Sequence, residues 1–113
     1  MVNEEYFEAA RKNEGVFRAV LRDIKNNRGK RPGGIYVPSN LDTESDIETI
    51  FEKYSKGKRY GIFTIADFAI LEDRAVLSFR DVAALSGGGA TLEYKIGKNN
   101  SVEFDKNVGI WMS

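Results

Sequence analysis

Aspartate and tyrosine side chains are the first candidates for chemistry in this sequence, because it contains no histidine and no cysteine. A carboxylate in an apolar cavity can act as a general base, since loss of water raises its pKa, and a tyrosine hydroxyl beside it can donate a hydrogen bond. Asp67 and Asp81 are the candidate bases, and Tyr36 and Tyr60 are the candidate donors. This set would suit a small histidine-free enzyme of the proton-transfer type.

The residue types that are missing exclude several other reactions. Without histidine the chain has no imidazole base for a serine hydrolase, and it lacks the commonest zinc ligand. Without cysteine it has no disulfide, no thiol nucleophile and no thiolate metal site. Carboxylates crowd residues 42–48, but they lack the spacing of a calcium-binding loop and suit the positive end of a helix dipole. The sequence therefore predicts neither a metal site nor a cofactor.

Two segments have compositions suited to an anion. Residues 87–89 are three consecutive glycines, but they lack the downstream lysine and serine of a phosphate-binding loop, so we interpret them as a bend or β-bulge between two strands. Arg28, Lys30 and Arg31 lie in the basic, glycine-rich segment 26–34 and are candidate anion-binding residues. A solvated turn after a helix explains the same three cations. Because the formal net charge is zero, the composition argues against a nucleic-acid-binding protein.

Length and composition predict one soluble domain over residues 1–113. The chain has 42% hydrophobic and 30% charged residues, which suits a single core of modest size. No apolar stretch approaches the roughly 20 residues of a membrane span, and the N-terminus is acidic where a signal sequence would be basic. We therefore expect a cytoplasmic protein that makes no contact with a membrane.

Apolar residues at helical spacing predict two helices. The first covers residues 4–25, and Gly15 is the point where it could bend or break. The second begins at a capping box formed by Thr43 and Asp46 and ends near Gly57. The apolar stripes that define the two helices are Phe17, Val20, Leu21 and Ile24 in the first and Ile47, Ile50, Phe51 and Tyr54 in the second.

In the second half of the chain the apolar period changes from about four to two. This change predicts four antiparallel strands, at residues 61–71, 75–84, 90–97 and 101–112. Residues 35–37 form a candidate fifth strand, which Pro38 would confine to an edge of the sheet.

Turn chemistry predicts the register of two hairpins. A two-residue turn at Asp73 and Arg74 would pair Phe68 with Phe79, Ile70 with Leu77, and Asp67 with Arg80 as a cross-strand ion pair. A three-residue turn at residues 98–100, with Asn100 in the left-handed conformation, would pair Ile96 with Val102, Tyr94 with Phe104, and Lys95 with Glu103.

The expected fold class is α+β, with two helices packed on a curved four-stranded antiparallel sheet. Residues 86–95 and 110–113 resemble the C-terminal part of small bacterial proteins that have a cystatin-like or nuclear-transport-factor-like α+β roll. This resemblance implies a sheet that curves around a helix. No catalytic residue can be transferred from it to this chain.

The strand predicted at residues 61–71 has apolar side chains on both faces, and two helices can cover only one of them. We therefore expect the other face to pack against a second copy of the chain, giving a homodimer, or to close over a small apolar ligand. The favoured function is a non-catalytic binding or interaction module, and the alternative is the proton-transfer enzyme. The candidate binding or interface residues are Trp111, Tyr94, Phe68, Phe79, Asp67 and Arg80.

Overall fold

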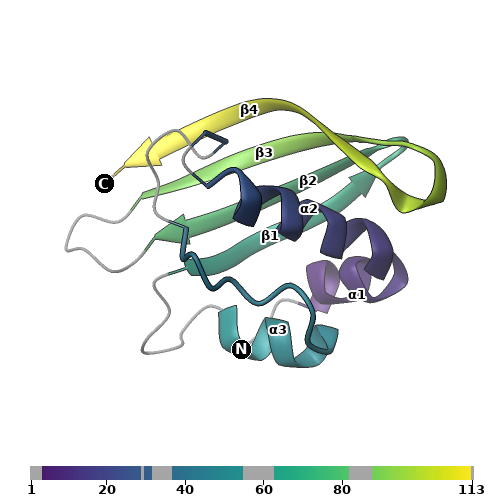
Figure 1. Cartoon of the computed structure of the whole chain (residues 1–113), viewed down its shortest axis with the longest axis horizontal. Helices are drawn as coiled ribbons and strands as arrows, with labels where there is room; N and C mark the ends of the chain where they lie inside the picture. The colour runs from purple at the N-terminus through teal and green to yellow at the C-terminus, as the bar shows by residue number, and fades with distance from the viewer. Residues whose placement is uncertain (1–3, 29, 32–36, 55–62, 82–87, 113) are drawn as a thin grey trace.

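The computed structural model describes residues 4–28, 30–31, 37–54, 63–81 and 88–112 of the chain. Within these segments the regular structure comprises three α-helices, one short 3-10 helix and one four-stranded antiparallel sheet. The α+β class is therefore confirmed. The sheet has the strand order β1-β2-β3-β4, so each strand is hydrogen-bonded to its neighbour in the sequence (Figure 1).

The single helix predicted at residues 4–25 is two helices in the structure, α1 (Glu4–Lys12) and α2 (Glu14–Asn26). They are separated at Asn13, whose backbone leaves the helical region with φ −129° and ψ 47° and whose side-chain amide donates to the carbonyl of Ala9 at 2.9 Å. Gly15 follows the break for a packing reason. A β-carbon at this position would lie 2.7 Å from Nδ2 of Asn100, so only glycine lets α2 approach the loop between the last two strands this closely.

Helix α3 (Ile47–Tyr54) is the second predicted helix, but it does not begin with the expected capping box. The Thr43 hydroxyl donates to the Glu44 carboxylate at 2.8 Å, so it does not cap the helix. Asp42 organises this turn, because its Oδ1 accepts from the backbone N–H groups of Glu44 at 3.1 Å and Ser45 at 3.0 Å. The predicted end of the helix near residue 57 lies outside the described residues. Of the candidate fifth strand only Val37 is described, and it is buried without being part of the sheet.

The first hairpin, between β1 (Phe63–Leu71) and β2 (Arg74–Asp81), turns one residue earlier than predicted. Leu71 pairs with Arg74, so the turn is formed by Glu72 and Asp73, and Glu72 adopts a φ of 58°. The predicted pairs are wrong as a result: Phe68 lies opposite Leu77, Ile70 opposite Ala75, Asp67 opposite Ser78, and Arg80 opposite Thr64. A positive φ is unusual for glutamate, which is why residue type did not indicate this turn.

A β-bulge at Ala66 changes the orientation of the two halves of β1. Ile65 pairs with Phe79 and Asp67 with Ser78, so Ala66 is an extra residue between the two pairs. The extra residue shifts the alternation by one, and Phe63, Ile65 and Phe68 consequently all lie on the same buried face. The aromatic side chains of β1 therefore all lie on the buried face, and the opposite face keeps the aliphatic residues Ala69 and Leu71.

The last hairpin, between β3 (Gly88–Ile96) and β4 (Val102–Met112), has the predicted register. Its turn is the 3-10 helix η1 (Lys98–Asn100), in which Asn99 and Asn100 both have positive φ values. Beyond Phe104, β4 contains two bulges, with Asp105 and Val108 as the extra residues. Gly88 and Gly89 pair regularly with both β2 and β4, so the prediction of a bend or bulge is wrong for these two glycines, and Gly87 lies outside the described residues.

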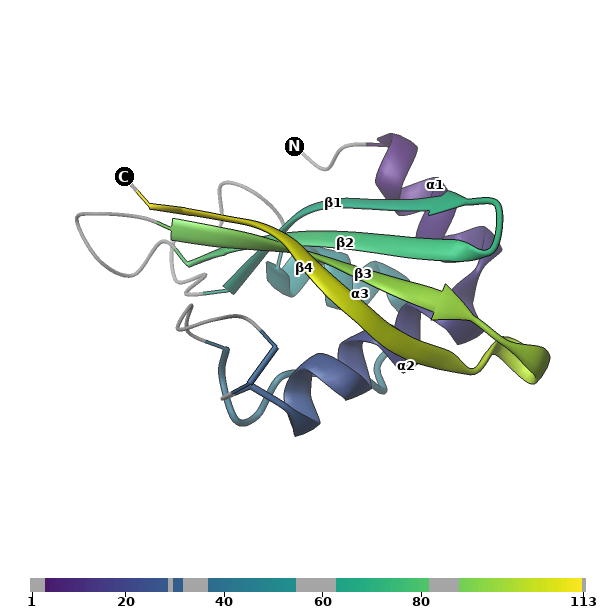
Figure 2. The ribbon, with the colours of Figure 1, turned by 90° about the horizontal axis from the view of Figure 1, so that it is seen from above.

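Helices α2 and α3 cover one face of the twisted sheet, and α1 packs against β1 at its edge (Figures 1 and 2). We call the helix-covered face the inner face and the opposite one the outer face. Phe17 of α2 joins the layers, since its ring stacks on Phe51 of α3 at 5.3 Å and meets Phe68 of β1 edge-on at 5.0 Å. These residues belong to one hydrophobic core that includes residues from all three helices and from β1, β2 and β3.

Candidate functional site

Three of the predicted binding residues are core residues in the structure. Phe68, Phe79 and Tyr94 are each no more than 1% exposed and lie on the inner face. Phe79 stacks on Phe63 with ring centroids 4.8 Å apart, and Tyr94 meets Phe104 edge-on at 5.5 Å. These aromatic rings fill the space between sheet and helices, so a surface for a partner must be built from other residues.

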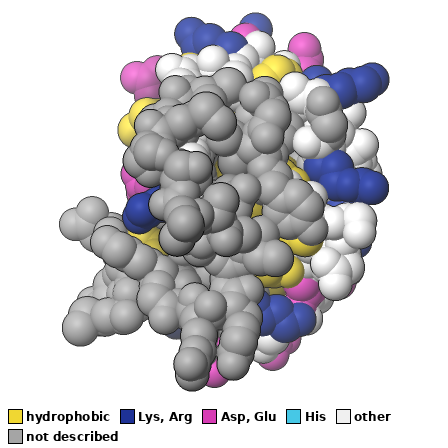
Figure 3. Space-filling view, turned by 90° about the vertical axis from the view of Figure 1, so that its left-hand side faces the viewer, with side chains coloured by type: hydrophobic (Ala, Val, Ile, Leu, Met, Phe, Trp, Pro, Cys, Tyr) yellow, Lys and Arg dark blue, Asp and Glu magenta, His cyan; other side chains and the backbone are white. Residues whose placement is uncertain are grey.

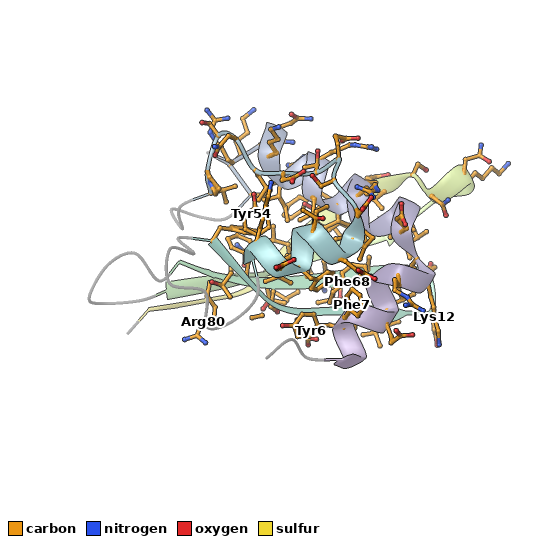
Figure 4. The ribbon with its side chains drawn as sticks, turned by 90° about the horizontal axis from the view of Figure 1, so that it is seen from below. Tyr6, Phe7, Lys12, Tyr54, Phe68 and Arg80 are labelled. Atoms are coloured by element: carbon orange, nitrogen blue, oxygen red, sulfur yellow. The ribbon has the colours of Figure 1, made fainter. Side chains whose placement is uncertain are left out.

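The remaining predicted residues divide between the outer face and segments that are not described. Asp67 and Arg80 are on the outer face, and Figure 4 shows Arg80 projecting away from the helices. Trp111 is paired through its backbone with Gly89, and its side chain lies outside the described residues. The same holds for the side chain of Asp81 and for the two tyrosines of the proton-transfer hypothesis, at positions 36 and 60. Asp67, the candidate base that is described, is exposed to solvent.

The outer face is apolar beside β1 and charged toward β4. Leu71 is 59% exposed, and Ala69 and Val76 are half-buried neighbours on the same face. In the middle of the sheet Ser78 and Thr91 share a hydrogen bond of 2.8 Å between their hydroxyl groups. Over β1 and β2 the outer face therefore carries small and aliphatic side chains together with the charged residues Asp67 and Arg80.

Toward β4 the outer face carries an ion-pair network centred on Arg74. One guanidinium nitrogen, Nη1, donates both to Oε2 of Glu93 at 2.8 Å and to the carboxylate of Asp105. Lys106 approaches the same Glu93 oxygen at 3.8 Å. The hydrogen bond from Arg74 lowers the pKa of Asp105 below its ordinary value. These four charges neutralise one another, so this end of the outer face is polar and internally satisfied.

Among the arginines that the structure describes, two form no ion pair with another described residue. Arg11, Arg18, Arg22, Arg31 and Arg74 each form an ion pair with a carboxylate. Arg28 and Arg80 form none with any residue in the described segments, and Asp67, one row from Arg80 on the outer face, is likewise without an ion pair there. These charges are available to a partner or ligand as far as the described residues are concerned.

The predicted anion-binding residues do not act as one group. Arg31 Nε donates to Oδ2 of Asp23 at 3.0 Å, and the Arg31 guanidinium lies 4.4 Å from the centre of the Phe104 ring. The Tyr94 hydroxyl donates to the same Asp23 oxygen at 2.7 Å. Burial, together with this bond to a carboxylate, raises the pKa of Tyr94 well above its ordinary value. We call Asp23, Arg31 and Tyr94 the Asp23 cluster, and it commits Arg31 to a structural role.

Arg28 and Lys30 remain exposed and line a hollow of about 450 Å³ together with Asn26 and Asn27, at the end of α2. Figure 3 looks at the end of the molecule where α2 terminates, and Lys and Arg side chains project there on the side that carries the helices. Asp23 and Asn107, which hold this region to the sheet, were not identified from the sequence. No local pattern could have shown them, because Asp23 and Tyr94 are 71 positions apart.

Within the described segments no group of three or more acidic side chains is placed to hold a metal ion, and no helix there is long and apolar enough to cross a membrane. Comparison of the chain with protein-family models, with curated proteins and with solved structures gave no match. The side chains of this protein and their contacts are therefore the basis for inferring its function.

Proposed function

We propose that this protein is a non-catalytic interaction module that forms a homodimer through the outer face of β1 and β2. The observation that carries the proposal is the pair of opposite charges on that face, Asp67 and Arg80, neither of which has an ion-pair partner among the described residues. Leu71, with 59% of its surface exposed, supplies apolar area beside them.

A two-fold axis makes this arrangement complementary to itself. In a symmetric dimer the same patch is used by both copies, so a residue that contacts a second one receives the reciprocal contact from the partner. Asp67 of one copy can then meet Arg80 of the other, twice per dimer. Ser78 lies directly opposite Asp67 and two positions before Arg80, and its hydroxyl is already bonded to Thr91. A small, satisfied side chain at this position lets two sheets approach to the usual spacing of about 10 Å.

The likeness to cystatin-like and nuclear-transport-factor-like rolls is part of the same proposal. It is supported by α2 lying across one face of a twisted antiparallel sheet while the other face carries none of the described helices (Figure 2). The proposal assigns that second face to the partner copy.

Exchange of the two charges tests the proposal. Sedimentation equilibrium at micromolar concentration should give a dimeric mass for the unmodified chain. Asp67→Arg and Arg80→Asp should each shift the protein to monomer, because each places like charges together at both pairs, and the double exchange should restore the dimer. Added sodium chloride should weaken the dimer, since exposed ion pairs are screened.

Lys12→Asp is the matched control for Arg80→Asp, because Lys12 is an exposed residue at the end of α1 and the substitution makes the same change of charge (Figure 4). It should leave the mass dimeric. A monomeric mass for the unmodified chain, or a double exchange that stays monomeric while remaining folded by circular dichroism, would contradict the proposed interface.

A further inference from the structure

The hollow at the end of α2 is lined only by donor-bearing side chains among the described residues. Arg28 contributes a guanidinium, Lys30 an ammonium and Asn26 an amide around a volume of about 450 Å³, whereas the Asn27 amide, which also lines the hollow, is already bound to Asp23. This volume is within the range of sites that hold small ligands. Two cations and the Asn26 amide match the needs of an oxyanion, which accepts several hydrogen bonds at once.

The loop that carries Arg28 and Lys30 is fixed at both sides. The Asn27 carbonyl accepts from the backbone N–H groups of Lys30 at 2.8 Å and Arg31 at 3.0 Å, which closes a tight turn. Arg31 is bound to Asp23 of α2, and its carbonyl accepts from Nδ2 of Asn107 on β4 at 3.0 Å. The backbone that carries Arg28 and Lys30 is therefore anchored before a ligand binds, which lowers the entropy cost of binding.

The net charge around the hollow is positive when the charges that are already paired within the protein are left out of the count. Asp23, the carboxylate nearest in the chain, accepts bonds from Arg31 and Tyr94 and is thereby neutralised. Two of the last four carbonyls of α2, which would repel an anion, are also occupied: Asp23 O accepts from the side chain and backbone of Asn27 at 2.9 and 3.0 Å, and Ile24 O accepts from the same backbone N–H at 3.3 Å. Arg28 and Lys30 keep uncompensated charge within the described segments.

From this geometry we infer that the hollow binds the phosphate group of a small phosphorylated ligand. A guanidinium offers two parallel N–H donors to a phosphate, and an ammonium adds a second charge from a different direction. A phosphate alone is smaller than the hollow, so the remaining volume accommodates the organic part of a phosphomonoester. The inference is independent of the proposed dimer, because none of these residues lies on the outer face of the sheet.

Titration of the ¹⁵N-labelled full chain with inorganic phosphate, ribose 5-phosphate and ribose tests this site. The side-chain amides of Asn26 and Asn27 should shift saturably with both phosphate compounds and not with ribose. Tighter binding of ribose 5-phosphate than of inorganic phosphate supports a phosphomonoester ligand, whereas equal affinity would restrict the site to the free ion and overturn the assignment of an organic ligand.

The variant Arg28→Gln/Lys30→Gln should weaken binding at least tenfold. Lys95→Gln/Lys98→Gln removes the same charge from an exposed strand end and turn, and it should leave the affinity within twofold. An equal loss in both variants would mean that net charge alone drives the shifts and would overturn the site. Sedimentation of Arg28→Gln/Lys30→Gln should give the same mass as the unmodified chain, which keeps this test separate from that of the dimer.

Discussion

The substitution Tyr94→Phe tests the energetic role of the Asp23 cluster. Tyr94 is completely buried, and its hydroxyl donates at 2.7 Å to a carboxylate that is itself bound by Arg31. Phenylalanine keeps the ring, the edge-on contact with Phe104 and the core volume, so the variant removes the hydroxyl and little else. Asp23 retains the bonds from Arg31 and Asn27.

The expected loss follows from the type of bond removed. A hydrogen bond to a charged group contributes about 1.5–3 kcal/mol, compared with about 0.5–1.5 kcal/mol for a neutral one. We therefore expect the free energy of unfolding at pH 7 to fall by about 2 kcal/mol in Tyr94→Phe. Urea denaturation measures the change, and the m-value should stay the same because the exposed area on unfolding is unchanged.

The stability above pH 10 provides a second test, because a loss of packing alone would not change how the free energy of unfolding depends on pH. Burial and the Asp23 carboxylate raise the pKa of Tyr94 in the folded state, while in the unfolded chain it titrates near pH 10. Below pH 10 Tyr94 is protonated in both the folded and the unfolded state, so its hydrogen bond makes its full contribution to the free energy of unfolding. Above pH 10 only the unfolded state loses this proton, so the free energy of unfolding of the unmodified protein falls by up to about 1.4 kcal/mol per pH unit. Tyr94→Phe has no hydroxyl to titrate, so the difference in the free energy of unfolding between this variant and the unmodified protein should shrink above pH 10.

Tyr54→Phe is the matched control for the same chemical change. The Tyr54 hydroxyl accepts from the backbone N–H of Asp42 at 2.8 Å, so this variant loses a bond between two uncharged groups. It should cost about 1 kcal/mol, less than Tyr94→Phe. A deficit in Tyr94→Phe no larger than that of the control and constant up to pH 11 would refute the assignment of a strong, carboxylate-linked bond.

Two further predictions concern the break between the first helices and the turn before α3. Alanine favours helices over glycine by about 1 kcal/mol, but Gly15→Ala should destabilise the protein because the new β-carbon would lie 3.0 Å from the β-carbon of Asn100. When Asn100→Gly has removed that contact, Gly15→Ala should instead stabilise the protein. Urea denaturation of the unmodified protein, the two single variants and the double variant measures the coupling between the two substitutions. If their effects on the free energy of unfolding were additive, this would contradict the contact. Burial would raise the pKa of Asp42, but the hydrogen bonds from Lys53, Ser45 and Glu44 outweigh it and lower that pKa. Asp42→Asn should therefore be less stable above pH 4 and approach the unmodified protein as the pH falls below it; a deficit at pH 2 as large as that at pH 7 would contradict this origin.

The sequence was sufficient for elements whose structure is determined locally. The β3–β4 hairpin was predicted pair by pair, because two consecutive asparagines accept positive φ and determine the turn. The β1–β2 hairpin was not, because its turn places Glu72 at a φ of 58°, which residue type disfavours. The candidate site shows the same division. The cations of the loop after α2 were identified from composition, whereas Asp23 was missed because its partner Tyr94 is brought to it only by the fold.

The bulge at Ala66 decides what kind of interface the outer face can form. With regular alternation β1 would have presented aromatic and aliphatic side chains on both faces, and burial of apolar area would have driven association. Because the extra residue places Phe63, Ile65 and Phe68 together in the core, the outer face retains Leu71 and its small neighbours beside exposed charge. An interface built on such a face must obtain its specificity from Asp67 and Arg80, and apolar area can only support it. A dimer of this kind is reversible and sensitive to salt, which suits a module that exchanges partners better than a permanent assembly.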